Sequence, residues 1–173
     1  MFVLGIDPGL SRCGYAVLEA RRNGARAVAI GVIRTPVDDP LPLRLLELQR
    51  EVRSLLQEHR PAAVAVERVL FQVNVRTAMS VGQASGIAMV EAAAAGCHVE
   101  QFSPNQVKDA VTGYGAASKA QVQDMVQRLL GLPTRPEPAD AAASAALALT
   151  YLACMTSPAL SAAGRAAQQG ARR

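Results

Sequence analysis

The first 34 residues contain three strand-like runs, separated by gaps that are too short to hold a helix. The runs occupy residues 2–6, 14–19 and 26–34, and both gaps contain glycine, which supplies the positive φ of tight turns. Parallel neighbours would need crossover connections of a dozen or more residues. We therefore expect the chain to open with three antiparallel strands.

Helices and strands then alternate as far as residue 102, and three helices follow. Leucine and valine residues form one apolar stripe over 42–59, and residues 62–67 are apolar up to Glu67, as in a strand buried on both faces. A short strand is expected at 97–102, and further helices are expected at 74–95, 104–111, 119–130 and 139–155. The order β-β-β-α-β-α-β-α-α-α predicts an α/β fold, with a mixed sheet that is flanked by helices.

Length and composition favour one domain. Half of the 173 residues are apolar, so residues 1–156 are expected to fold around one core. Residues 157–173 contain almost no large apolar side chain and predict a disordered basic tail. No stretch approaches the roughly 20 apolar residues that span a bilayer, and no signal peptide is recognisable. Three scattered cysteines indicate a reducing compartment, so a cytoplasmic protein without membrane association is expected.

The basic residues are unevenly divided between arginine and lysine. The net charge of +4 favours an anionic partner without establishing one. The only two lysines, Lys108 and Lys119, flank a glycine-containing loop at 112–116. They are either solvated surface charges or a phosphate-binding pair, and their shared location favours the second interpretation.

Three carboxylates occur where the predicted elements begin or end. Asp7 and Glu67 end apolar strands, and Asp140 opens an alanine-rich helix. Asp7 also fits a common turn and Asp140 a helix cap, whereas a buried Glu67 requires a partner. Carboxylates fixed on rigid elements are the usual ligands of Mg²⁺. Two such ions can activate water and neutralise the leaving oxygen in phosphodiester hydrolysis.

Five short motifs extend this pattern along the chain. In their order and spacing they resemble those of the RuvC-type Holliday-junction resolvases, or crossover junction endodeoxyribonucleases. The similarity covers about residues 1–155, and its motifs are Leu4–Gly9, Ala65–Val69, Gly82–Gly86, Gln106–Lys108 and Pro138–Ala142.

The resemblance implies an RNase H-like fold, with a five-stranded sheet whose first three strands are antiparallel. It also implies a homodimer that binds a four-way DNA junction and resolves it by paired, symmetrical nicks during homologous recombination and DNA repair. Asp7, Glu67 and Asp140 match the family's catalytic, metal-binding acids, which hold Mg²⁺ (two ions per site, with Mn²⁺ as a substitute). The RuvA–RuvB branch-migration complex is the partner implied by the family.

One expected acid is missing. The family carries a fourth carboxylate three residues after the position of Asp140, where this chain has Ala143. Either Ala143 is an inactivating substitution, or the site works with fewer ligands; we favour the first interpretation. Ser144 is the one neighbouring oxygen that could stand in for the carboxylate, although 3.6-residue geometry directs it away from that position.

The resemblance also indicates residues that bind DNA. Lys108 and Lys119 match basic positions that line the DNA cleft. Phe71 falls where related chains stack an aromatic ring on the opened junction, and Leu70 is the alternative wedge. Arg76 either pairs with phosphate or covers helix surface.

Three other functions fit part of the sequence pattern. RNase H-like nucleases that process ribosomal RNA precursors share the opening Gly-Ile-Asp-Pro-Gly but lack the Gln-Val-Lys motif. Actin-like kinases require two such domains, which 173 residues cannot hold. The third interpretation is a junction-binding module without catalysis, which Ala143 favours.

Overall fold

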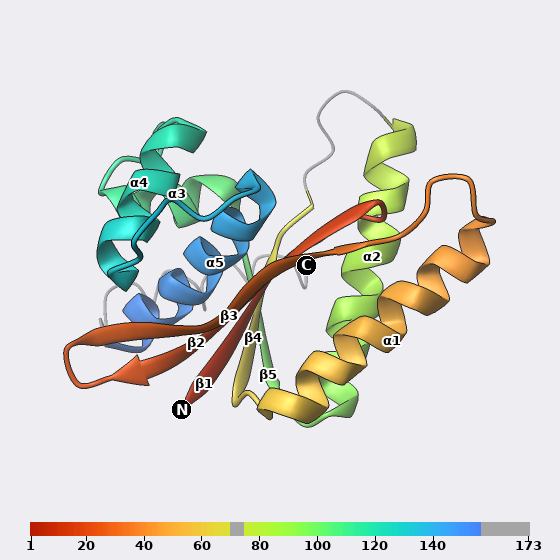
Figure 1. The fold of residues 1–173 in the computed structure, drawn as a ribbon, viewed down its shortest axis with the longest axis horizontal. Coiled ribbons are helices and arrows are strands. Elements are labelled where there is room, and N and C mark those ends of the chain that lie inside the picture. Colours follow the sequence, from red (N-terminus) through yellow and green to blue (C-terminus); the bar gives the residue numbers. More distant parts are fainter. Residues whose placement is uncertain (70–74, 157–173) are drawn as a thin grey trace, which may run out of the picture.

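Five strands form one mixed sheet with the order β3-β2-β1-β4-β5 (Figure 1). The computed structural model describes residues 1–69 and 75–156, with the side chains of residues 1–69 and 78–155. The first three strands pair antiparallel, while β4 lies parallel to β1 and β5 parallel to β4. This topology confirms the predicted RNase H-like sheet, whose strands are β1 (Phe2–Asp7), β2 (Arg12–Arg21), β3 (Gly24–Arg34), β4 (Ala63–Glu67) and β5 (His98–Phe102).

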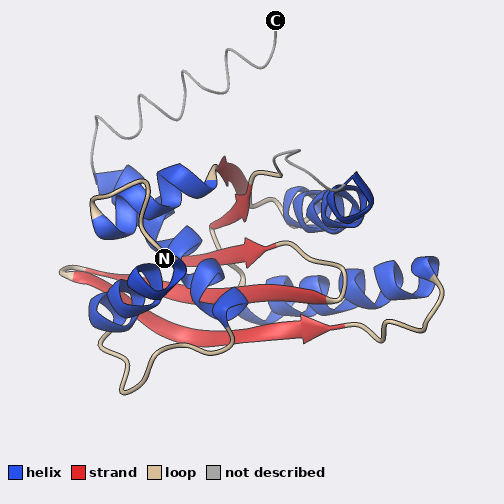
Figure 2. Ribbon diagram, turned by 90° about the horizontal axis from the view of Figure 1, so that it is seen from above, coloured by secondary structure: helices blue, strands red, loops and turns tan. Residues whose placement is uncertain are grey.

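Helices cover both faces of the sheet (Figures 1 and 2). One face carries α1 (Leu41–His59) and α2 (Val75–Ala94), and the other carries α3 (Pro104–Thr112), α4 (Lys119–Leu130) and α5 (Ala139–Thr156). Successive residues of β1 serve opposite cores, as the pleat requires: Val3 packs with α3, α4 and α5, and Leu4 packs with α1 and α2. No helix among the described residues is long and apolar enough to cross a membrane.

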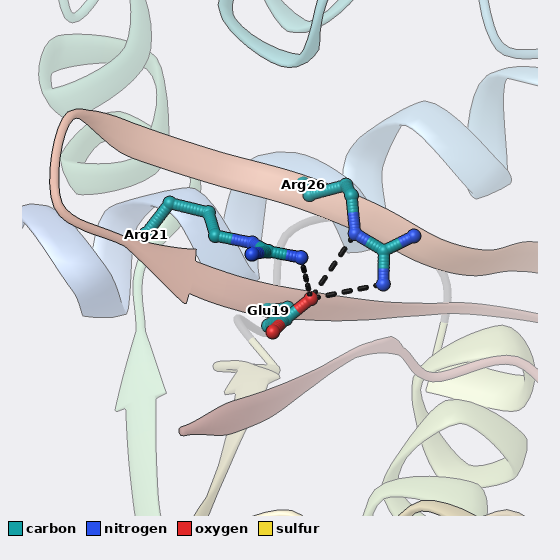
Figure 3. A network of polar contacts seen from close by, with 3 residues as sticks. All are labelled: Glu19, Arg21 and Arg26. Atoms are coloured by element: carbon teal, nitrogen blue, oxygen red, sulfur yellow. Dashed lines mark hydrogen bonds and ion pairs between the residues drawn. The ribbon is translucent and has the colours of Figure 1, made fainter.

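The hairpin of β2 and β3 is longer than the predicted runs of 14–19 and 26–34. Its ladder extends from the pair Arg12 and Arg34 to the turn at Gly24. The far end of the hairpin lies in solvent and carries charged side chains, so the apolar pattern that predicts a strand stops before the strands do. There, Glu19 accepts hydrogen bonds from Arg21 at 2.6 Å and from Arg26 at 2.9 Å (Figure 3).

Candidate active site

Two of the predicted acids meet at the centre of the sheet. Because β1 and β4 are parallel neighbours with Ile6 opposite Val66, the next residues, Asp7 and Glu67, leave the same edge side by side. Their carboxyl groups share a hydrogen bond. Burial, the charge and hydrogen bond of Glu67, and the charge of Asp140 together raise the pKa of Asp7 to about 8, against a lowering by Lys119. The carboxyl group of Asp7 therefore holds its proton more strongly than an ordinary aspartic acid does.

Two glycines bring the third acid close to this pair. Gly14 lies opposite Asp7 in the β1–β2 ladder, and a Cβ atom at Gly14 would lie 2.1 Å from the carbonyl oxygen of Asp140. A Cβ atom at Gly5 would lie 1.9 Å from the carbonyl oxygen of Ser144. The backbone of α5 thus rests directly on β1 and β2. The sequence analysis did not identify these glycines, although glycine inside an apolar strand is a known sign of close backbone approach.

Asp140 is held by an arginine from the neighbouring strand. The Nε atom of Arg12 lies 2.8 Å from Oδ2 of Asp140, which joins the start of β2 to the start of α5. About a third of the Asp140 side chain is exposed. Asp140 is the second residue of α5 and so lies inside its first turn, not at the capping position before the helix, and its carboxylate pairs with a side chain of another element. Arg12 was not singled out from the sequence, where one arginine among many carries no signal.

The acids line a cavity of about 380 Å³ that opens between the sheet edge and three helices. Both lysines line the same cavity, Lys108 from α3 and Lys119 from the first turn of α4. Each of these helices begins with a capping box, formed by Ser103 with Gln106 and by Ser118 with Gln121, which fixes the start of the helix firmly. The structure therefore brings together the five charged residues that the sequence analysis placed at the site, namely Asp7, Glu67, Lys108, Lys119 and Asp140.

Ala143 also lines this cavity, one helical turn after Asp140. A methyl group thus occupies the wall where the family resemblance places a fourth acid. Ser144 cannot replace that acid, because its side chain is fully buried and its hydroxyl donates to the carbonyl oxygen of Ala141 at 2.8 Å. The possibility that Ser144 stands in as a ligand was therefore wrong.

The other predicted DNA contacts cannot be placed. Leu70 and Phe71 lie outside the described residues. Arg76 belongs to α2, but its side chain is outside the described part of the chain. The tail at 157–173 likewise lies outside the described residues.

The donor set fits a hard divalent cation only in part. The Asp7–Glu67 pair shares a proton in a place where a cation could bind both carboxylates, since an ion between two acids relieves the same repulsion. Within the described residues, however, no three His, Cys, Asp or Glu side chains form a ready-made metal group. The third acid of the cavity, Asp140, is engaged by Arg12 through its Oδ2 atom.

The family model for the crossover junction endodeoxyribonuclease RuvC matches residues 3–151. Among curated relatives, RuvC of Leifsonia xyli is 50% identical, with 98% of this chain and 85% of that protein aligned. RuvC of Salinispora arenicola is 53% identical, with 88% of this chain and 87% of that protein aligned.

Solved structures give the same answer at the level of the fold. This chain superposes on Thermus thermophilus RuvC in complex with a Holliday junction substrate with a TM-score of 0.83 and 37% identity, over 88% of this chain and 93% of that one. The yeast mitochondrial Holliday junction resolvase Ydc2 shares the fold at 14% identity and a TM-score of 0.65, over 87% of this chain and 78% of that one. By the family model, the curated relatives and the fold together, this chain belongs to the crossover junction endodeoxyribonuclease RuvC family.

Proposed function

We propose that this chain resolves four-way DNA junctions by one metal-dependent nick in each of two symmetrically related strands. The observation that carries the proposal is the cavity in which three acids lie with the chain's only two lysines. Acids can hold cations and lysines can hold phosphate, and a phosphodiester needs both. The related Thermus structure holds a Holliday junction substrate. A role in recombination and repair alongside RuvA–RuvB belongs to the same proposal.

The acids and lysines would divide the work of hydrolysis. Asp7, Glu67 and Asp140 would hold Mg²⁺, with two ions per site and Mn²⁺ as a substitute. When bound, the metal supplies activation of water and neutralisation of the leaving oxygen. Because its pKa is raised, Asp7 would have to lose its proton before it could hold a cation. Lys108 and Lys119 would provide positive charge in the same cavity, where they would attract the phosphate and oppose the charge that develops on it.

Junction binding without cleavage is the second candidate function. Two observations favour it: the methyl group of Ala143 on the cavity wall, and the engagement of Asp140 by Arg12. Both reduce the number of carboxylate oxygens that are available to a cation. The resolvase and the binding module differ only in whether the remaining acids suffice.

Strand nicking of a synthetic four-way junction in Mg²⁺ or Mn²⁺ separates the two candidates. The chain is compared with Ala143→Asp, and gel-shift binding in Ca²⁺ is measured in parallel. A linear duplex of the same sequence controls for junction selectivity, and Asp7→Asn controls for chemistry at this site. Nicking by the chain as given shows that three acids suffice. Nicking only by Ala143→Asp identifies Ala143 as the inactivating residue and favours the binding module for this chain. Binding of the duplex and the junction alike would refute both candidates.

A homodimer is part of the proposal, and α2 provides the face for it. Met79 is 60% exposed and Val90 65% exposed, and an added Cβ atom at Gly82 or Gly86 would meet nothing within 4 Å. Glycine costs a helix interior roughly 0.5–1 kcal/mol relative to alanine. The protomer itself does not need these two glycines, whereas a second copy could approach closely there.

Sedimentation of the free protein tests this interface. Gly82→Leu should shift the chain from dimer to monomer, because the bulky side chain would separate two facing α2 helices. Leu129→Ala, which changes an exposed apolar residue of α4, should leave the dimer intact. A monomeric starting protein, or a Gly82→Leu variant that remains dimeric, would exclude this face.

A further inference from the structure

Arg12 forms an ion pair with Asp140, which is one of the proposed metal ligands. Asp140 belongs to the acids that line the cavity, yet its Oδ2 atom lies 2.8 Å from the Arg12 guanidinium. A carboxylate held by a guanidinium has fewer lone pairs left for a cation. Arg12 and a metal ion therefore compete for Asp140.

A second arginine stands beside Arg12. Arg34 is its direct partner in the β2–β3 ladder, so both side chains project from the same face of the sheet. Like charges that are directly opposite destabilise a sheet, and Arg34 is exposed, without an ion pair among the described side chains. Asp140 is thus the one described carboxylate that pairs with this arginine pair, and any cation that takes Asp140 leaves two neighbouring guanidinium groups without an anion.

The far end of the same hairpin holds a similar group of two arginines and one carboxylate, at a place where no metal ion is proposed. Glu19 pairs there with Arg21 and Arg26, in the solvent-exposed network of Figure 3. That network also has two arginines and one carboxylate, but Glu19 does not line the cavity. It provides a matched control within the same two strands.

We propose that Arg12 exchanges partners during substrate binding: it pairs with Asp140 in the metal-free protein and passes to a DNA backbone phosphate beside Arg34 when a cation takes Asp140. The inference rests on the proposed function, because it assumes both the metal and the DNA. Guanidinium groups bind carboxylate and phosphate with the same forked geometry, so one side chain can serve either partner.

Thermodynamic linkage follows from the exchange. If cation binding frees Arg12 for phosphate, then DNA binding must raise the affinity for the cation by the same factor. The arginine pair would also hold a phosphate near the acids, at the end of the cavity where β2 and α5 begin. Metal and DNA would then be retained together more firmly than either alone.

The first experiment measures Mn²⁺ binding to the free chain by electron paramagnetic resonance, without DNA. Arg12→Gln should bind Mn²⁺ about two- to fivefold more tightly than the starting chain, which is the range that a partly exposed ion pair spans. The matched control Arg21→Gln should bind Mn²⁺ as the starting chain does. Arg12→Lys keeps the charge without the fork and should fall between the two. Unchanged or weaker binding by Arg12→Gln, in a variant that unfolds at the normal temperature, would overturn the competition.

The second experiment measures junction affinity in EDTA and so needs no metal. Asp140→Asn should strengthen binding about two- to fivefold, because it frees Arg12 for phosphate. In the double variant Arg12→Gln/Asp140→Asn this gain should vanish. A gain that persists in the double variant would be a general effect of lost negative charge and would overturn the exchange. If no variant binds the junction, the proposed function fails with the phosphate half of the exchange, whereas the Mn²⁺ result still decides the competition for Asp140.

Discussion

Replacing Gly14 with alanine should separate α5 from the sheet at the point where the site is built. The added Cβ atom would lie 2.1 Å from the carbonyl oxygen of Asp140 and 2.7 Å from its carbonyl carbon. Ordinary contact begins at 3.4 Å, so α5 would have to retreat by about 1 Å. Both atoms belong to the backbone, so no side-chain rotation can relieve the clash.

The size of the effect follows from the packing of a well-filled core. Overpacking of this kind costs typically 1–3 kcal/mol. In a chain of this length, each kcal/mol shifts the unfolding temperature by roughly 2–4 °C, so a fall of about 2–12 °C is expected. Asp140 would move with the helix, and a displacement of about 1 Å can cost on the order of 100-fold in rate.

Thermal unfolding by circular dichroism and Mn²⁺ affinity are the two assays for this substitution. Gly115→Ala is the matched control, since its Cβ atom would lie 3.6 Å from the nearest atom, the carbonyl oxygen of Asn105. The control should change neither quantity. A Gly14→Ala protein that unfolds at the starting temperature and binds Mn²⁺ normally would show that α5 does not rest on β2 as described.

Three further predictions concern pH, salt and the opposite face of the sheet. Because Asp7 has its pKa raised from 3.8 to about 8 in the folded, metal-free chain, folding retains a proton that the unfolded chain has lost. Urea denaturation should therefore show stability falling between about pH 4 and pH 8, and Asp7→Asn should remove this slope. Lys108→Ala and Lys119→Ala should each lower the salt slope of junction binding by about one unit in gel shifts at several salt concentrations, and an unchanged slope would place that lysine off the phosphate path. Glu91 on α2 accepts hydrogen bonds at 2.8 Å from Arg53 and at 2.6 Å from Gln49, both on α1. Glu91→Ala should thus cost about 1–2 kcal/mol in chemical denaturation, at the low end because Arg53 is half exposed, while junction binding stays normal.

Local patterns in the sequence marked the acids and lysines as candidates, and the resemblance to the resolvase family assigned them to one site. A carboxylate at the end of an apolar strand lies at the edge of the sheet where that strand ends. Once β1 and β4 are parallel neighbours, Asp7 and Glu67 must therefore meet. The two lysines were recognisable because lysine is rare in this chain, and both line the cavity.

The remaining features depend on contacts between distant segments. The pairing of Arg12 with Asp140 joins residues that are far apart in the chain, and no periodicity marks it. The closeness of α5 to β2 depends on the absence of a side chain at Gly14, which a propensity scale registers only as a weak strand residue. The ends of β2 were missed because its first and last residues, Arg12 and Arg21, are charged, and the start of β3 was missed because it begins at a turn glycine, Gly24.

The order of the acids along the chain also sets when the site can exist. Asp7 and Glu67 belong to strands that leave the ribosome early, whereas Asp140 arrives with α5, the last helix of the described chain. At about 5–20 residues per second, synthesis takes roughly 4–15 s to pass from the second acid to the third. During that interval the growing chain carries an incomplete acid set and lacks the helix that closes the cavity. Any cleavage by the proposed site therefore has to await the synthesis of α5, the helix that carries Asp140.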